Sequence, residues 1–380
     1  MRIAAFNVEN LFQRARALNQ DDWLDKPGRD PSRWSAGRKA LDAHARLNAL
    51  LRKTVYTKAD KAVIVKHLVE LGLQKSDESS LVILRKNRGT LLKRTKTGIE
   101  IVANGRDEWI GWLELKMEAV NEIATQNTAR VLRDVDADVV VVVEAEDRIS
   151  LTRFNEQVLE VVGGRRYDHI MLLDGNDDRG IDVGLISRAP FAVDMLRTHI
   201  DDRSGKNRIF SRDCPEFHLR LPSGEGLVVL ANHFKSKGFG TPAESNAKRR
   251  AQARRVREIY DGLRAQGIAH IAILGDLNDT PDSDPLSPLL RDSSDLKDIS
   301  EHPLFESDGR PGTYANGTKS NKIDFLLLSP ALFAKVTRGG VSRQGVWGGT
   351  HGTLWPILPE MKFAYQAASD HAAIWADLDI

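Results

Sequence analysis

The sequence predicts a mixed α/β protein of the α+β type, in which strands outnumber helices. Six short apolar runs have the length and composition of buried strands, and each has polar residues at one end. Only two long helical patterns, residues 118–135 and 243–266, lie among these runs, so strands and helices do not alternate regularly. No glycine-rich turn follows the first strand, where a nucleotide-binding parallel sheet needs one to hold phosphates. A doubly wound parallel sheet is therefore a poor fit.

Both helical patterns are amphipathic. Ile123 and Val131 share the apolar face of the first, and Val256 and Leu263 share that of the second. The second pattern also carries several basic residues, including Arg249, away from its apolar face. We expect these arginines to form a solvated surface outside the functional site, with a binding surface as the alternative.

Length and composition indicate an ordinary globular protein. The chain has 380 residues, of which 41% are hydrophobic and 28% charged, enough for one large domain or a domain with an insert. No apolar run approaches the roughly 20 residues that cross a bilayer, so no transmembrane segment is expected. The chain starts with strand-like residues rather than a leader pattern, so we expect a cytoplasmic protein, although a chain trimmed of its leader would look the same.

The single cysteine, Cys214, excludes an internal disulfide framework and suits a reducing compartment, so no disulfide-linked partner is expected. It lies in RDCPEF without a neighbouring histidine or helix start to lower its pKa, which indicates a structural role. The ten histidines have no short paired spacing, which excludes a zinc finger or a metalloprotease helix. Any metal would be held by oxygen ligands.

The run of residues 271–279, IAILGDLND, leads an apolar strand directly into a carboxylate and an amide. Strand alternation would point Asp276 and Asn278 to the same side. A carboxylate in this place can hold an attacking water or a metal ion, and an amide can hold a phosphate oxygen. A strand followed by a simple Asx turn is the alternative for this run taken alone.

Other strand-like runs carry the same kind of polar end, which argues against the simple turn. These ends supply Asn7 and Glu9, Glu144, Asn232 with His233 and Lys235, Asp324, and Asp370 with His371. We therefore expect one rim of polar side chains, assembled from distant parts of the chain.

Seven motifs in this order resemble the endonuclease/exonuclease/phosphatase superfamily, which includes DNase I-like nucleases, inositol-phosphate phosphatases and bacterial sphingomyelinases. The motifs are FNVENLF, VVEAED, GIDVGLISR, NHFKSKG, GDLNDTPDSDPL, IDFLLLS and SDH, and they cover residues 1–12 and about 127–380. The resemblance implies a four-layer sandwich, in which two packed mixed β-sheets are flanked by helices. Its site would lie at one edge of the sandwich, where the polar strand ends meet.

The metal site follows from chemistry and resemblance together. Glu144 ends a fully apolar run, where an unpaired carboxylate is too costly to bury, so a partner or a metal is expected. Its hard oxygen suits Mg²⁺ or Mn²⁺. The resemblance makes Glu144 the principal ligand, with Glu9 and Asp370 completing the shell directly or through water.

The resemblance also assigns catalytic roles. Asp276 would be the general base for the attacking water, with Asn278 and Asn7 fixing its geometry. His371 would pair with Asp324 and face the phosphate as an imidazolium. His233 and Lys235 would supply a second cationic pair. Asp182 and Arg212 lie in family-like segments and would support substrate binding.

One large departure from the family is an insert at residues 13–120. It holds 22 Lys and Arg against 14 Asp and Glu, a charge of about +8. Helical spacing over 34–53 and 57–72, followed by strand-like alternation over 80–94 and 98–115, predicts a small basic α+β subdomain. A basic stretch around the turn of an expected hairpin would bind substrate and suggests a polyanionic partner, with a solvated surface as the alternative. The stretch comprises Arg85, Lys86, Arg88, Lys93, Arg94 and Lys96.

Two catalytic functions and one non-catalytic one fit these residues. The first choice is a metal-dependent nuclease that cleaves DNA or RNA with activated water. The alternative is a phosphatase or phosphodiesterase of small molecules or lipid head groups. A lipid enzyme would need an exposed apolar hairpin, and residues 345–358, with Trp347 and Trp355, are the nearest candidate, although this loop could equally cap the site. A non-catalytic binding module is least favoured, because no catalytic position has been lost.

Overall fold

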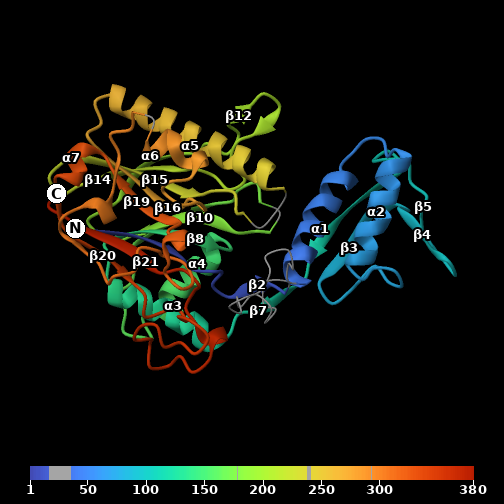
Figure 1. The fold of residues 1–380 in the computed structure, drawn as a ribbon, viewed down its shortest axis with the longest axis horizontal. Coiled ribbons are helices and arrows are strands. Elements are labelled where there is room, and N and C mark those ends of the chain that lie inside the picture. The colour runs from blue at the N-terminus through green and yellow to red at the C-terminus, as the bar shows by residue number, and fades with distance from the viewer. Residues whose placement is uncertain (17–35, 178, 238–240, 292) are drawn as a thin grey trace. The chain divides into compact units, whose positions relative to one another are not determined.

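The computed structural model describes residues 1–16, 36–177, 179–237, 241–291 and 293–380. It divides into two compact units (Figure 1). The first consists of residues 1–12, 120–237 and 241–380, and the second of residues 13–119, of which 17–35 lie outside the description. The first two residues of the helix expected at 34–53, and the last residue of NHFKSKG, also lie outside the described residues.

The first unit contains a seven-stranded mixed sheet, here called the first sheet. Its order is β18 (Phe305–Glu306), β20 (Val336–Ser342), β21 (Ala373–Leu378), β1 (Arg2–Asn7), β8 (Val139–Ala145), β10 (Asp182–Ser187) and β9 (His169–Leu173). β1 and β8 run parallel, while β21 and β10 lie antiparallel on either side of them. The ends of β1 and β8 therefore share one edge with the beginnings of β21 and β10.

A six-stranded mixed sheet, the second sheet, repeats this arrangement. Its order is β11 (Val193–Arg197), β14 (Glu216–Arg220), β15 (Gly226–His233), β16 (His270–Asp276), β19 (Asp324–Leu328) and β17 (Lys297–Asp298). β15 and β16 are parallel, and β19 is antiparallel to β16. The ends of β15 and β16 thus meet the beginning of β19.

The two sheets pack face to face over one apolar core. Val141 and Val143 of the first sheet belong to the same buried cluster as Val229, Leu274 and Leu326 of the second. Helices α3 (Glu122–Val135) and α4 (Arg148–Phe154) cover the outer face of the first sheet, and α5 (Pro242–Ala265) and α6 (Ser287–Leu290) cover that of the second (Figure 1). The expected four-layer sandwich is confirmed.

Shorter elements connect these layers. They are the π-helix η2 (Asn155–Leu159), the hairpin of β12 (Arg203–Ser204) and β13 (Asn207–Arg208), α7 (Pro330–Phe333), and the 3₁₀ turns η3 (Asp284–Leu286), η4 (Ile299–Glu301), η5 (Lys319–Asn321) and η6 (Ala364–Gln366).

Local signals set the ends of the long helices. Thr241 and Glu244 form a capping box around α5, with Pro242 in its first turn. The side chain of Asn121 caps α3, which begins at Glu122 rather than at residue 118 as expected, because β7 (Met117–Ala119) occupies the preceding residues.

The second unit has its own core. Helices α1 (Ala36–Leu51) and α2 (Lys58–Glu70) pack with three two-stranded sheets, and Leu47, Leu68 and Trp109 are among the buried residues. The sheets pair β2 (Gln13–Ala15) with β7, β3 (Val82–Gly89) with β6 (Trp109–Leu115), and β4 (Leu92–Thr95) with β5 (Gly98–Ile101).

The basic residues 85–96 do not all surround one turn, because β3 pairs with β6, whereas β4 forms a hairpin with β5. Val82 and Leu84 lie opposite Leu115 and Leu113, and all four side chains are buried. The long-range pairing buries apolar side chains in one core, and this outweighs the local turn signal.

The second unit leaves and rejoins the first at neighbouring points. The backbone N–H of Val120 donates a hydrogen bond to the carbonyl of Phe12, at 2.9 Å. Among the described residues, no helix is long and apolar enough to cross a bilayer.

Arg249 of α5 corrects the expectation that the arginines of this helix form a solvated face. Only 1% of Arg249 is exposed. Its Nε lies 2.9 Å from Asp279, and its Nη1 donates to the carbonyl of Lys235 at 2.9 Å. Arg249 therefore ties α5 to the loops that follow β15 and β16.

We expect Arg249→Ala to lower the free energy of unfolding by about 3 kcal/mol, because the carboxylate of Asp279 loses a buried partner. Lys237 lies 2.7 Å from Asp279 and still partly compensates its charge, so the loss of free energy should be at the lower end of the range for a broken buried ion pair. Urea unfolding followed by circular dichroism measures this change. The exposed Arg254→Ala on the same helix is the control and should change the free energy by less than about 0.5 kcal/mol. Equal effects of the two variants would contradict the buried role of Arg249.

Candidate active site

The polar strand ends of the two sheets meet around Asp276, the last residue of β16. The Asp276 side chain is 2% exposed. Its Oδ1 accepts the backbone N–H of Asn278 at 2.8 Å, and its Oδ2 accepts the side-chain amides of Asn278 at 3.0 Å and Asn7 at 3.5 Å. The carboxylate is therefore held in one orientation by amides from both sheets.

Asn278 reaches Asp276 in a different way from the one expected. The strand ends at Asp276, and Asn278 has a φ of 53°, in the left-handed region. A turn rather than strand alternation thus brings the amide back onto the carboxylate. Gly275 is required for another reason, because it lies opposite Asn232 of β15 and a Cβ on it would be 2.0 Å from the carbonyl oxygen of Asn232.

A second carboxylate, Asp324, lies directly opposite Asp276 across β16 and β19. Its Oδ2 is 2.9 Å from Nδ1 of His371 and also accepts the hydroxyl of Thr313 at 2.6 Å. Nε2 of the same imidazole is 3.9 Å from Asp276 and 3.7 Å from Asp370. His371 thus stands between carboxylates that would otherwise repel each other.

These neighbours set the charge of the histidine. Burial by itself would lower the pKa of His371, but Asp324, Asp370 and Asp276 outweigh burial and raise its pKa well above the ordinary value. Burial, followed by repulsion from Asp324, raises the pKa of Asp276 well above its ordinary value. His371 is therefore an imidazolium, and Asp276 is a carboxylate of increased basicity.

Glu144 is placed by a β-bulge. Val143 pairs with Val183 and Ala145 with Asp182, which leaves Glu144 as the extra residue of β8 with a φ of 66°. Its Oε1 lies 3.5 Å from Nε2 of His233. The bulge turns Glu144 out of the regular alternation of a fully buried strand.

Glu9 and Asp370 adjoin each other at the same edge. The backbone N–H of Asp370 donates to Oε2 of Glu9 at 3.1 Å, and the backbone N–H of Glu9 donates to Oδ1 of Asn7 at 3.0 Å. The expected carboxylates of β1 and the segment before β21 are thus brought together.

Backbone strain concentrates on this rim. Glu9, Asn10, Glu144 and Asn278 all have positive φ, and they make up four of the seven such non-glycine residues in the described parts of the chain. Each costs on the order of 1–3 kcal/mol, and strain of this kind is retained where function requires it. The strained positions therefore mark the rim as the functional edge.

His233 does not fit the cationic pair expected with Lys235. It is 2% exposed, and burial followed by the neighbouring Arg179, His371 and Lys235 lowers its pKa well below the ordinary value. His233 is therefore a neutral imidazole. Lys235 is half-buried, its backbone N–H donates to Oε1 of Gln252 at 2.9 Å, and its Nζ donates to the carbonyl of Ser236 at 3.2 Å.

Asp182 and Arg212 lie together in a buried supporting layer. A Cβ on Gly175 would be 2.7 Å from Asp182 and 2.9 Å from the Cα of Arg212. Arg212, 1% exposed, pairs with Asp177 at 2.9 Å and donates to the carbonyl of Phe234 at 3.2 Å. That carbonyl also accepts the amide of Asn278 at 3.2 Å, so Arg212 supports Asn278 from behind.

The residues of the rim offer donors for a metal ion. Asp276, Asp324 and His371 form a group whose geometry could hold one, although these three are already paired with each other. Several buried polar atoms nearby make no hydrogen bond to any described residue, as expected beside a site for ligand or water. They are Asn10 Oδ1, Asn232 Oδ1, His233 Nδ1 and Arg212 Nη2. The expected ligands Glu144, Glu9 and Asp370 carry the hard oxygens that Mg²⁺ and Mn²⁺ prefer; Glu9 and Asp370 adjoin each other, whereas Glu144 faces His233.

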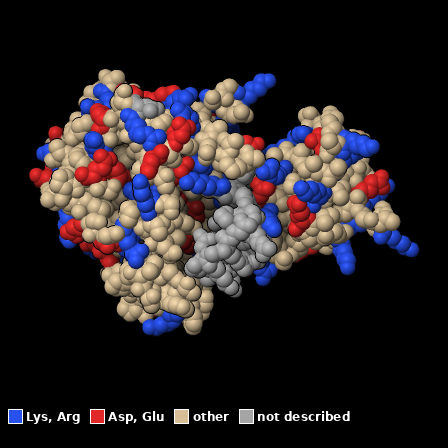
Figure 2. Space-filling view, in the orientation of Figure 1, with Lys and Arg blue, Asp and Glu red and all other residues tan. Residues whose placement is uncertain are grey.

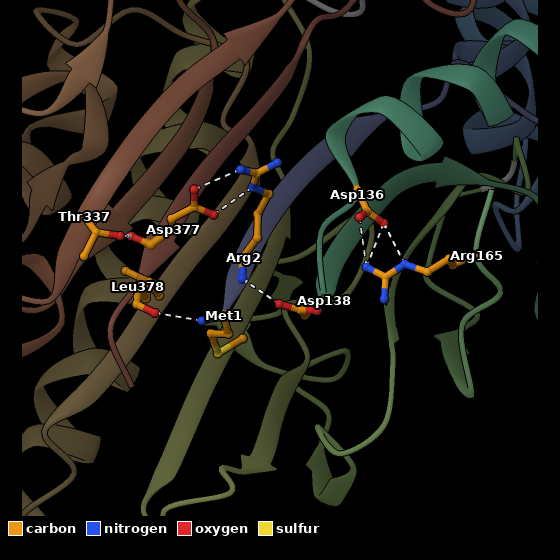
Figure 3. A pocket seen from close by; sticks show the side chains of 8 residues that line it. All are labelled: Met1, Arg2, Asp136, Asp138, Arg165, Thr337, Asp377 and Leu378. Carbon is orange, nitrogen blue, oxygen red and sulfur yellow. Dashed lines mark hydrogen bonds and ion pairs between the residues drawn. The ribbon is translucent and has the colours of Figure 1, made fainter. Parts of the chain in front are cut away.

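A pocket of about 450 Å³ at the start of β1 and the end of β21 differs from the rim (Figure 3). Arg2 pairs with Asp377 at 2.7 Å, and its backbone N–H donates to Asp138 at 2.7 Å. Arg165 pairs with Asp136 at 2.9 Å. The acidic and basic residues that line this pocket are paired with one another, and the pocket lies at the opposite ends of the strands from the rim.

Several residues of the site escaped the sequence analysis. Thr313 bonds the carboxylate and backbone of Asp324, and the Tyr314 ring lies 4.9 Å from the ring of His371. Arg179 pairs with Asp177 at 2.8 Å. Thr313 and Tyr314 are unmarked in the sequence because their partners Asp324 and His371 come later in the chain, and Arg179 is unmarked although its partner is only two residues before it.

Cys214 and the basic stretch are two further groups that the sequence singled out. Cys214 is fully buried, and burial raises the pKa of its thiol well above the ordinary value, in agreement with a structural role. The basic stretch belongs to the second unit, where Arg85 pairs with Glu114 at 2.8 Å, Arg94 with Asp77 at 2.6 Å, and Arg88 donates to the carbonyl of Asp107 at 2.8 Å.

Asp182 generates a pH-dependent prediction. Burial raises its pKa from 3.8 to about 7, so the folded state binds this proton more tightly than the unfolded state. The associated stability is complete below pH 3.8 and is lost as the pH rises to about 7. Above pH 7, we expect the free energy of unfolding of Asp182→Asn to exceed that of the wild type by at most about 4 kcal/mol. Near pH 4, the two free energies should be equal. Denaturant unfolding between pH 4 and 9 measures the difference, and a difference independent of pH would contradict this account.

Comparison with known proteins supports the motif-based resemblance. A family model described as Endonuclease/Exonuclease/phosphatase family matches residues 100–341, more than half of the chain. No curated protein sequence matches significantly.

Solved structures of low sequence identity are also similar. Truncated TDP2 of Caenorhabditis elegans is 18% identical with a TM-score of 0.46, and the match covers 67% of this chain and 90% of that chain. A mannosyl-6-phosphatase of Bacteroides thetaiotaomicron is 16% identical with a TM-score of 0.49, covering 68% and 92%. The human Nocturnin catalytic domain is 14% identical with a TM-score of 0.47, covering 68% and 87%.

The family assignment depends on the family model, and the two-sheet sandwich observed here agrees with it. The chain belongs to the endonuclease/exonuclease/phosphatase family, and it is a phosphoester hydrolase.

Proposed function

We propose that the protein is a divalent-metal-dependent phosphodiesterase that cleaves nucleic acid with activated water. The observation that carries the catalytic part is the pairing of Asp276, oriented by two amides, with the imidazolium of His371. A base for water and a cation for the phosphate then act from one edge of the sandwich.

In this mechanism Asp276 accepts a proton from the attacking water through Oδ2. Burial strengthens Asp276 as a base, and the amides of Asn278 and Asn7 keep its carboxylate aligned. The water oxygen forms a bond to phosphorus as the bond to the leaving oxygen breaks. The imidazolium of His371, fixed by Asp324, stabilises the negative charge on the non-bridging oxygens.

The remaining rim residues bind and orient the substrate. Lys235 supplies positive charge, and neutral His233 can donate a hydrogen bond to a phosphate oxygen. Asp182 and Arg212 hold the layer behind Asn278. Glu144, with Glu9 and Asp370, would hold Mg²⁺ or Mn²⁺, which neutralises phosphate charge and assists departure of the leaving oxygen when bound.

The preference for nucleic acid depends on residues 13–120, which we propose to be an inserted subdomain that binds the phosphate backbone. Lys86, Lys93 and Lys96 are exposed and form no ion pair with any residue that the structure describes. Lys and Arg side chains project from the end of this unit that carries β4 and β5 (Figure 2). Several exposed lysines of this kind attract a polyanion more strongly than they attract a single phosphate.

The structure of residues 345–358 favours the nuclease over a lipid enzyme. In the loop of residues 345–358, Nε1 of Trp355 donates to the carbonyl of Val346 at 3.0 Å, and Arg310 and Arg343 stack over its ring at 5.3 and 5.6 Å. Trp355 therefore packs against two arginines of neighbouring segments, which favours a packed loop over an apolar hairpin presented to a membrane.

The decisive assay offers labelled single- and double-stranded DNA, RNA, sphingomyelin and inositol phosphates to the protein with Mg²⁺, Mn²⁺ or excess EDTA. We expect cleavage of nucleic acid, complete loss in EDTA and recovery with either metal. Glu144→Gln should need more metal, and Asp276→Asn and His371→Ala should each lower kcat by at least about 100-fold.

Cys214→Ser is the matched control and should leave kcat unchanged. Full activity in EDTA, or near-normal kcat in the Asp276 or His371 variant, would disprove the mechanism. Hydrolysis of only the small phosphates or the lipid would assign the protein to the alternative function.

The exposed lysines of the second unit lead to a separate prediction about how nucleic-acid affinity depends on salt concentration. Each phosphate contact contributes roughly 0.7 to 0.9 to the slope of log affinity against log salt. Replacing Lys86, Lys93 and Lys96 by Gln should lower that slope by up to about 2 to 3 and raise KM for nucleic acid, with kcat preserved. Arg85, Arg88 and Arg94 serve as the control set, since their side chains already bind Glu114, Asp107 and Asp77. An unchanged slope in the lysine variant would show that this unit does not bind the backbone.

A further inference from the structure

Two aromatic side chains, Phe363 and Tyr365, are exposed close to the catalytic edge. Their exposed fractions are 55% and 60%, and of the described aromatic residues only Trp112 is comparably exposed. The two rings are nearly parallel, with an interplanar angle of 7° and centroids 5.4 Å apart. The rings are stacked side by side with an offset, and more than half of each residue stays exposed to solvent. Large aromatic surfaces are normally buried, so a preformed exposed stack requires an explanation.

The stack is fixed by a rigid turn. Oε1 of the buried Gln366 accepts the backbone N–H groups of Lys362 at 2.7 Å and Phe363 at 3.1 Å. The carbonyl of Gln366 accepts the side-chain amide of Asn127 at 2.8 Å. The two rings are therefore presented by η6, which is anchored on α3, and little conformational entropy remains to be lost when they bind a ligand.

The same turns of α3 hold catalytic segments. The hydroxyl of Thr125 donates to the carbonyl of Leu11 at 2.8 Å, two residues beyond Glu9. The hydroxyl of Thr128 donates to the carbonyl of Ala368 at 2.8 Å, three residues before His371. Tyr365 lies six positions before His371, a span of at most about 20 Å. The stack thus lies within a few nucleotides of the reacting phosphate.

We propose that Phe363 and Tyr365 form a stacking subsite for an unpaired nucleobase, and that the substrate is single-stranded at that position. This inference rests on the proposed nuclease function. A base within a duplex has both faces covered by its neighbours, whereas an unpaired base can stack on an exposed ring and gain about 5- to 150-fold in affinity, equivalent to 1–3 kcal/mol. Exposed Lys362, adjacent to the stack, adds a cation for the backbone of the same nucleotide.

The geometry favours a base over a protein partner. Two rings offer far less area than the roughly 800 Å² per partner that a stable protein interface buries. Exposed Lys362 precedes Phe363 in the chain and places a charge beside the stack.

The experiment compares the wild type with Phe363→Ala/Tyr365→Ala. The probes are single-stranded and double-stranded oligonucleotides of one sequence, and a series of single strands in which one base at a time is replaced by an abasic residue. We expect the double variant to bind the normal single strand at least about 5-fold more weakly and to raise KM similarly. One abasic position should weaken wild-type binding by the same factor and leave the double variant unaffected. Turnover of a small nitrophenyl phosphodiester should be unchanged.

Two further variants separate stacking from general effects of mutation. Phe363→Leu/Tyr365→Leu keeps apolar volume but removes the aromatic faces, so it should behave like the alanine pair, whereas Phe363→Tyr/Tyr365→Phe should bind normally. Leu304→Ala removes an exposed apolar side chain, 52% exposed, from the loop before β18 and should also bind normally.

The outcomes distinguish this inference from the proposed function. If the wild type cleaves nucleic acid and the double variant binds every strand normally, the stacking subsite is disproved and the nuclease stands. Equal weakening for normal and all abasic strands would likewise exclude a base contact. If the wild type cleaves only the small diester and no nucleic acid, the proposed function fails and the subsite fails with it.

Discussion

The site depends on one electrostatic constraint, the placement of Asp276 and Asp324 directly opposite each other in neighbouring antiparallel strands. Two buried carboxylates in this arrangement repel, and the structure resolves the repulsion with the imidazolium of His371. That cation comes from the first sheet, whereas both acids come from the second. The two sheets therefore need to meet at this edge for the charges to balance, and the correct packing of the sandwich and the correct protonation of the site depend on each other.

The backbone around this centre is strained, and the core makes the strain tolerable. Positive φ angles at Glu9, Glu144 and Asn278 each cost on the order of 1–3 kcal/mol. Each fully buried valine or leucine of the shared core contributes about 1.5–3 kcal/mol in return. Because β16 is buried throughout and β8 is buried at every residue except Glu144, their ends are held firmly enough to keep unfavourable conformations. Rigid strands thus position side chains that a flexible loop would not hold.

The sequence predicted the strands, the long helices and the meeting of their polar ends, because apolar runs and their last residues are local features. It also predicted the contact between His371 and Asp324 through family motifs. It failed where partners are distant in the chain. The bulge at Glu144 appears only in the register with β10, and the inward side chain of Arg249 only once Asp279 is placed beneath α5. The pairing of β3 with β6 likewise depends on a core that no short segment reveals.

The hydrogen bond between Val120 and Phe12 has a consequence for how such a protein can change. Because the chain departs from and returns to nearly the same point, the segment between these residues is attached like a cassette. Its removal would leave a gap that a very short connection closes, with little entropic cost. Lineages could therefore exchange, enlarge or discard this cassette, and laboratory grafts could do the same, while the catalytic sandwich keeps its own chain path.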